Sequence, residues 1–181
     1  MNYETRPPRR GLLPELPPEF SNHIARVEYA VFTNAKRSLA WQLFSDLSLW
    51  PKFCNLYENI RWHGTPWTPG SRLRIDVREP VNATVDRVLT VCMPPNHIAW
   101  INHVRGYTME QWISFDAYQG GGTRVSTWIE VTGGEVSAHR SEDIRLLETV
   151  VEGWFDNFRA ECDRIARSDQ FKDIHYPTTT D

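Results

Sequence analysis

Two side chains on one predicted β-hairpin have the types and spacing that general acid–base chemistry needs. Arg105-Gly106 is a two-residue turn signal, because glycine readily adopts positive φ, and it fixes how the flanking strands pair. In that register His103 and Glu110 lie on one face of the hairpin as diagonal neighbours. A histidine beside a carboxylate is typical of sites that transfer protons, which an aldol cyclisation or a dehydration requires. The alternative is an ordinary solvent-facing pair near the hairpin tip.

The other face of this hairpin is more apolar and has the composition of a binding surface. It carries Ile98, Trp100, Asn102, Met109, Gln111 and Ile113 and continues into Phe115. Side chains two residues apart share a face, so only one of the two faces can point into the protein. We expect the apolar face to point inward. Trp100 and Met109 would then enclose a ligand, and Asn102 and Gln111 would orient it through hydrogen bonds.

Further candidate residues lie outside the hairpin. Glu130 is a candidate acid or base, because burial would raise the pKa of its carboxyl group; an outward-facing glutamate is the alternative. Trp62 and Trp128 are candidates for the wall of a binding site. Trp154 and Phe158 lie on the apolar stripe of a predicted C-terminal helix, where they would face the hairpin.

The sequence lacks the patterns of several other site types. Its histidines show no HxH or HxxxH spacing and Cys54, Cys92 and Cys162 are far apart, so neither a metal site nor a disulfide framework is indicated. Gly120-Gly121-Gly122 joins two predicted strands, whereas a phosphate-binding loop leads from a strand into a helix. No nucleophile motif is present. We therefore expect neither a metal nor a cofactor.

Composition narrows the classes of partner and compartment. The 181 residues carry a formal net charge of −3 and their arginines are scattered, which argues against nucleic-acid binding. No apolar run is long enough to span a membrane and the N-terminus has no secretory signal, so we expect a cytoplasmic protein, monomeric or homodimeric. The 8 Trp, 8 Phe and 6 Tyr predict a thick core or a lined cavity.

Hydropathy patterns predict an α+β domain. A strand at 25–33 precedes a short, bent pair of helices at 35–54 that Asn34 would cap. Strands with turns between them are then predicted at 57–63, 72–79, 83–93, 97–104, 107–118 and 123–132. A helix from 141 to 167 follows, with Ser141 as its cap and one continuous apolar stripe.

The order of these elements predicts how they pack together. Consecutive strands joined by short turns form an antiparallel meander, and the first strand can pair with the last. The resulting seven-stranded sheet would curve around the long C-terminal helix and leave a cavity where the two do not meet. The domain spans 23–167, with an extended, proline-rich tail at 1–22 and a polar tail at 168–181.

Short segments between residues 25 and 167 carry a likeness to known proteins. They are Ala40-Trp41, Phe44-Ser45-Asp46, Trp50-Pro51-Lys52-Phe53, Gly70-Ser71, Pro94-Pro95, Ile98-Ala99-Trp100, Ile113-Ser114-Phe115, Gly122-Thr123-Arg124-Val125 and the helix around Trp154. With the order of elements, they resemble the START-like, helix-grip superfamily and within it the polyketide cyclase/dehydrase-type SRPBCC proteins. The resemblance implies the helix-grip fold. It implies no particular catalytic motif, because the superfamily mixes cyclases, aromatase subunits, lipid carriers and hormone-binding proteins.

Three functions follow as hypotheses. The first is a protein that binds a hydrophobic or aromatic small molecule in a cavity between the sheet and the C-terminal helix. The second is a cyclase or dehydratase of polyketide or aromatic metabolism, in which Glu110, Glu130 or His103 is the acid or base. The third is a non-catalytic interaction module without an open cavity. Binding ranks first because it needs only the architecture, whereas catalysis also needs a perturbed titratable group.

Overall fold

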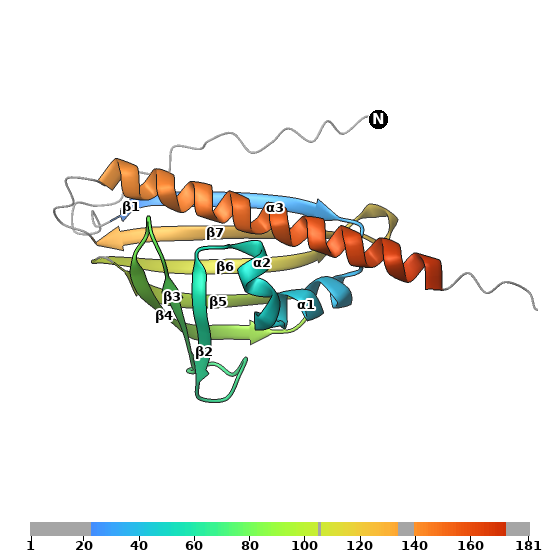
Figure 1. Ribbon diagram of the computed structural model, residues 1–181, viewed down its shortest axis with the longest axis horizontal. Coiled ribbons are helices and arrows are strands. Elements are labelled where there is room, and N and C mark those ends of the chain that lie inside the picture. Colours follow the sequence, from blue (N-terminus) through green and yellow to red (C-terminus); the bar gives the residue numbers. More distant parts are fainter. Residues whose placement is uncertain (1–22, 105, 134–139, 173–181) are drawn as a thin grey trace, which may run out of the picture.

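An antiparallel sheet of seven strands and one long helix form most of the described chain (Figure 1). In this computed structural model the described residues are 23–104, 106–133 and 140–172, so the predicted tail at 1–22 lies outside them. The strands are β1 (His23–Thr33), β2 (Tyr57–His63), β3 (Arg72–Val77), β4 (Ala83–Met93), β5 (His97–Val104), β6 (Tyr107–Ala117) and β7 (Thr123–Gly133). Their order in the sheet, β1-β7-β6-β5-β4-β3-β2, confirms the predicted meander in which the first strand pairs with the last.

The long helix α3 (Arg140–Lys172) runs along β1 on one face of the sheet (Figure 1). Two hydrogen bonds join them: the Thr33 hydroxyl donates to Asp163 at 2.6 Å and the Tyr29 hydroxyl donates to Asp156 at 3.2 Å. The helix begins at Arg140, so Ser141 lies in its first turn rather than at the predicted cap position. It also continues past residue 167, because no proline or glycine interrupts the segment before Lys172.

Two short helices follow β1, as predicted. They are α1 (Arg37–Ser45) and α2 (Trp50–Phe53), separated by the 3-10 turn η2 (Leu47–Leu49). The N-cap position of α1 is Lys36 rather than the predicted Asn34, whose backbone N–H donates to Asp163 of α3 at 2.8 Å instead. Pro51 lies in the first turn of α2, where the missing N–H costs no helical hydrogen bond.

An aromatic cluster fills the interior next to α1 and α2. Phe44 is fully buried at its centre, and the Trp50 indole N–H donates to the Phe44 carbonyl at 2.7 Å. Ring centroids lie 5.3 to 6.2 Å from that of Phe44 in Trp41, Trp50, Trp67, Trp100, Phe115, Trp154 and Phe158. The aromatic excess of the sequence therefore builds a thick core at this end of the domain.

Candidate ligand-binding cavity

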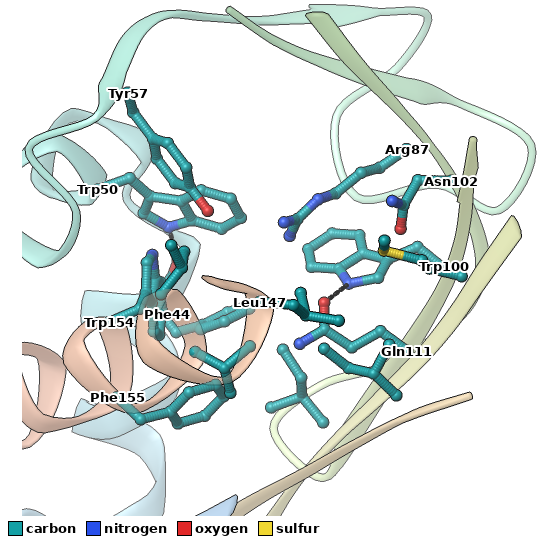
Figure 2. A pocket seen from close by; sticks show the side chains of 15 residues that line it. Phe44, Trp50, Tyr57, Arg87, Trp100, Asn102, Gln111, Leu147, Trp154 and Phe155 are labelled. Carbon is teal, nitrogen blue, oxygen red and sulfur yellow. Dashed lines mark hydrogen bonds between the residues drawn. The ribbon is translucent and has the colours of Figure 1, made fainter. Parts of the chain in front are cut away.

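A cavity lies between the sheet and α3, beyond the aromatic cluster (Figure 2). It consists of two adjacent chambers, a first chamber of about 60 Å³ that includes Trp50, Trp100 and Trp154 in its wall and a second chamber of about 120 Å³ that includes Val77, Val85 and Val104. Both chambers are lined by Tyr57, Arg87, Asn102, Met109, Leu147 and Val150. The apolar face of the β5–β6 hairpin thus points inward, as predicted.

Gln111 holds one wall of the first chamber in place. Its side-chain oxygen accepts a hydrogen bond from the Trp100 indole N–H at 3.1 Å, and its amide donates to the Thr127 hydroxyl at 3.0 Å. That hydroxyl in turn donates to the Trp112 carbonyl at 2.8 Å. Both ends of the Gln111 amide are therefore bonded within the protein. Gln111 therefore positions Trp100, and its contact with a ligand stays a prediction.

Replacing Gln111 with leucine is expected to lower the free energy of unfolding by about 1–3 kcal/mol, because it leaves the Trp100 indole N–H buried without a partner. Urea unfolding followed by tryptophan emission measures the loss. Ser114→Ala is the matched control, since Ser114 lies on the same strand but points to the other face of the sheet and should cost far less. Equal losses for the two variants would contradict the assignment.

Arg87 and Asn102 face each other across β4 and β5 and both point into the cavity (Figure 2). The Arg87 guanidinium carbon lies 5.4 Å from the centre of the Trp100 ring, and its Nε is shielded from solvent without a hydrogen-bond partner. The Asn102 side chain is only 5% exposed, and it forms no hydrogen bond with any of the described residues. These two side chains bring polar groups to an otherwise apolar wall.

Tyr57 supplies a third polar group beside Arg87 (Figure 2). Burial raises the pKa of the Tyr57 hydroxyl, and the neighbouring positive charge of Arg87 opposes this only in part. Burial likewise raises the pKa of the Cys54 thiol nearby. Both groups are therefore protonated at neutral pH, and the Tyr57 hydroxyl is a hydrogen-bond donor.

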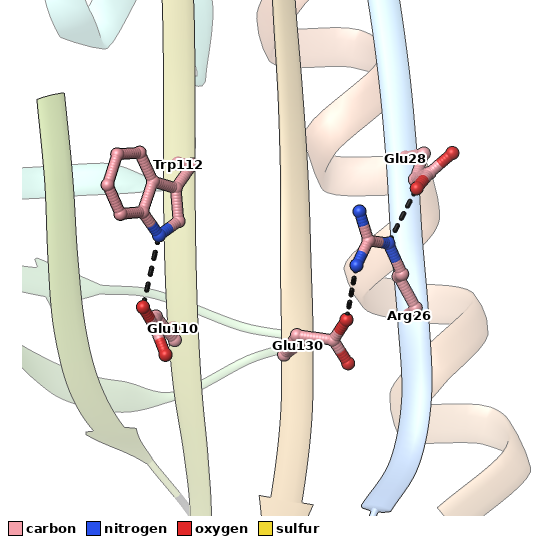
Figure 3. A network of polar contacts seen from close by, with 5 residues as sticks. All are labelled: Arg26, Glu28, Glu110, Trp112 and Glu130. Atoms are coloured by element: carbon pink, nitrogen blue, oxygen red, sulfur yellow. Dashed lines mark hydrogen bonds and ion pairs between the residues drawn. The ribbon is translucent and has the colours of Figure 1, made fainter. Parts of the chain in front are cut away.

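The three predicted acid–base residues lie on the face of the sheet that points away from the cavity. Figure 3 shows Glu110 accepting a hydrogen bond from the Trp112 indole at 3.0 Å and Glu130 paired with Arg26 at 2.6 Å. The His103 ring nitrogen is 3.0 Å from the Thr108 hydroxyl. Strand alternation is the reason: once the apolar face of the hairpin points inward, His103 and Glu110 must point outward. Their positions do not fit the predicted role in acting on a molecule in the cavity.

Three aromatic residues predicted to bind a ligand also lie elsewhere. Trp128 is on the outer face, where its ring stacks on that of Trp112 with a centroid distance of 5.8 Å. Trp62 packs edge-on against Trp67 at 5.2 Å, away from both chambers. Phe158 is fully buried within the aromatic cluster. None of the three lines either chamber: Trp128 points to the outer face, and the aromatic cluster occupies the space that Trp62 and Phe158 face.

The remaining predicted residues lie together on the cavity wall. They are Trp100, Asn102, Met109, Gln111 and Trp154. Arg87 was missed, although the sequence holds a signal for it: in β4 it alternates with Val85 and Leu89 and so shares their buried face. An arginine in the apolar register of a strand is the pattern that reveals it.

Two other features bear on the type of site. Among the residues that the structure describes, no three His, Cys, Asp or Glu side chains are grouped so that they could hold a metal ion. Among the same residues, no helix is both long and apolar enough to cross a membrane.

Solved structures share this arrangement of sheet and helix. A hypothetical protein from Helicobacter pylori superposes with a TM-score of 0.64 at 14% identity, covering 76% of this chain and 88% of its own. Ara h 8.0201 superposes with a TM-score of 0.63 at 12% identity, covering 76% of this chain and 97% of its own. The chain has the helix-grip fold. A protein from Deinococcus radiodurans also matches, with a TM-score of 0.53 at 17% identity, covering 77% of this chain and 98% of its own.

Sequence comparison adds nothing to the fold. No family model and no curated protein matches the chain. The helix-grip fold is therefore established by structure alone, and the function has to be argued from the site itself.

Proposed function

We propose that this helix-grip protein binds a small hydrophobic or aromatic molecule in the cavity between the sheet and α3. The observation that carries the proposal is the composition of the wall: aromatic and aliphatic side chains from both the sheet and α3 surround a few polar groups gathered around Arg87. Small-molecule sites in proteins have this combination of an apolar lining and few, well-placed polar groups. The resemblance to SRPBCC proteins supports the same function.

The size of the cavity limits its occupant. The second chamber has a volume of about 120 Å³, and the first chamber beside it has about 60 Å³. For scale, an apolar cavity of roughly 150 Å³ in a protein interior holds one benzene molecule. Neither chamber alone reaches this volume, so a single ring or a short chain would occupy both chambers together, and a polycyclic polyketide would need the wall to move.

The cyclase or dehydratase hypothesis receives less support. Its predicted acids and bases point away from the cavity, and no carboxylate or imidazole lines the first chamber within the described part of the chain. Asp143 borders the second chamber, where its carboxylate accepts a hydrogen bond from the Tyr107 hydroxyl at 3.0 Å. Enclosure and binding are thus better supported than proton transfer.

Titration with toluene and indole tests the proposal. Each is expected to raise the melting temperature and to change the tryptophan emission, because Trp50, Trp100 and Trp154 line the first chamber. A ligand at 100 times its Kd would add about 2.7 kcal/mol to the free energy of unfolding. If no small aromatic compound stabilises the protein or alters its emission, the non-catalytic module without an open cavity is the better description.

Substitutions on the outer face should leave this binding unchanged. Glu110→Gln, Glu130→Gln and His103→Ala are each expected to keep the affinity for indole within about twofold, because their side chains lie on the other side of the sheet. Isothermal titration of each variant measures the effect. A tenfold loss in any of them would mean that the outer face contributes to the site.

A further inference from the structure

Arg87 is a half-buried cation with no carboxylate partner among the described residues. It lines both chambers, its Nε has no hydrogen-bond partner, and none of the described carboxylates forms an ion pair with it. Arginine keeps its charge in proteins, so this charge borders a largely apolar cavity with only the Tyr57 hydroxyl and the Trp100 ring as partners. An apolar side chain of similar size would be better tolerated there. Its position therefore indicates a need for an anionic partner that the described residues do not supply.

The neighbouring polar groups complete a set of donors. The Asn102 amide lies opposite Arg87 on the adjacent strand and has no protein partner among the described residues. The protonated Tyr57 hydroxyl lines the cavity on the other side of Arg87 (Figure 2). The carboxylate at the edge of the second chamber, Asp143, is bonded to Tyr107 rather than to Arg87. A guanidinium, an amide N–H and a phenol hydroxyl together suit an acceptor that carries negative charge.

The guanidinium is also held in place before any ligand arrives. It lies over the ring of Trp100, an arrangement in which the π-system attracts the cation. Trp100 is itself fixed by the hydrogen bond to Gln111. A cation whose position is set by packing and by a second hydrogen-bonded layer loses little freedom on binding.

We propose that the molecule bound in this cavity is a small monocarboxylate, with its ring or chain enclosed by the apolar wall and its carboxylate paired with Arg87. Asn102 and Tyr57 donate further hydrogen bonds to the same carboxylate. A planar carboxylate matches the two parallel donors of a guanidinium, which favours it over a rounder anion. The inference rests on the proposed function and adds the chemical class of the ligand to it.

Paired acidic and neutral probes test the assignment on the full chain. Benzoate and phenylacetate are compared with benzamide and phenylacetamide by isothermal titration at low salt. Each carboxylate is expected to bind at least tenfold more tightly than its amide. In Arg87→Met that preference should disappear, and in Arg87→Lys, which keeps the positive charge, part of it should remain. Arg74→Met is the matched control: Arg74 lies on the adjacent strand, points to the outer face and has a shielded Nε without a hydrogen bond, 3.9 Å from Asp76, so the preference should persist.

The outcomes separate this inference from the proposed function. If toluene and indole bind but the carboxylates show no preference over the amides, the anionic ligand is wrong and the hydrophobic cavity stands. If none of the probes binds, the proposed function fails and the inference fails with it. If the preference survives in Arg87→Met, Arg87 is not the counter-ion and the proposal is overturned.

The unliganded Arg87→Met protein provides a second readout. It should melt at the same temperature as the parent protein or at a higher one, because methionine removes a half-buried charge that no described carboxylate pairs with and fills similar space. A melting temperature several degrees lower would show that Arg87 serves the fold, and it would count against the proposal.

Discussion

Replacing Phe44 with alanine is expected to lower the free energy of unfolding by about 3–5 kcal/mol, the range measured for removing a buried aromatic ring. The Phe44 ring is 0% exposed and lies at the centre of the aromatic cluster, where it contacts side chains from α2, the sheet and α3. Large indole and phenyl rings surround the position and cannot easily collapse into the space that alanine would leave. The loss of unfolding free energy should therefore lie at the upper end of this range.

Urea unfolding of the Phe44→Ala protein, followed by far-UV circular dichroism, measures this effect. Phe32→Ala is the matched control, because Phe32 is 50% exposed on the outer face of β1 and its removal should cost well under half as much. If the two substitutions cost the same, the aromatic cluster would not be the main source of stability that its packing indicates.

Replacing Val150 with phenylalanine is expected to weaken the binding of small aromatic compounds at least a hundredfold. Val150 lies on α3 and lines both chambers, so a larger ring at this position would occupy space that the ligand needs. The cavity has only about 60 and 120 Å³ in its two parts, which leaves no alternative room for a ligand of benzene size. Because the substitution fills a void, the melting temperature of the unliganded protein should stay close to that of the parent.

Thr149→Phe is the control for this substitution. It introduces the same ring one residue earlier in α3, at an exposed position, and should leave ligand affinity unchanged. Val150→Ala should enlarge the cavity and admit bulkier aromatic compounds. Isothermal titration with indole distinguishes the three variants. Unchanged affinity in Val150→Phe would place the ligand outside this cavity.

Local sequence patterns were sufficient to predict the helices and strands and their order along the chain. Alternation along β3 and the 3-4 spacing on α3 are properties of neighbouring residues, and they fix which side of a strand or helix is apolar. The Arg105-Gly106 turn fixed the register of β5 and β6, which the structure confirms with Trp100 opposite Gln111. The boundaries of α3 were less well predicted, because polar residues continue a helix as readily as they end one.

Which residues line the cavity depends on contacts between segments that are distant in the sequence. Trp62 and Phe158 lie on inward-facing positions, yet the aromatic cluster takes up the space in front of them. The sequence alone did not show whether Glu130 is buried or exposed. In the structure it lies on the outer face, where Arg26 of the neighbouring edge strand pairs with it. Gln111 became a structural residue only because Trp100 and Thr127 lie within hydrogen-bond distance on either side.

The amino-acid sequence by itself determined that a curved antiparallel sheet would hold one amphipathic helix, because side-chain alternation and helical periodicity are local. Only the tertiary structure decided how much space remained between them and which polar groups bordered it. Cavity volume is the small difference between the room that the backbone encloses and the side chains that fill it, and this difference depends on every element at once. For the same reason Arg87 became recognisable as a cation without a carboxylate partner among the described residues only when the strands and α3 were in place around it.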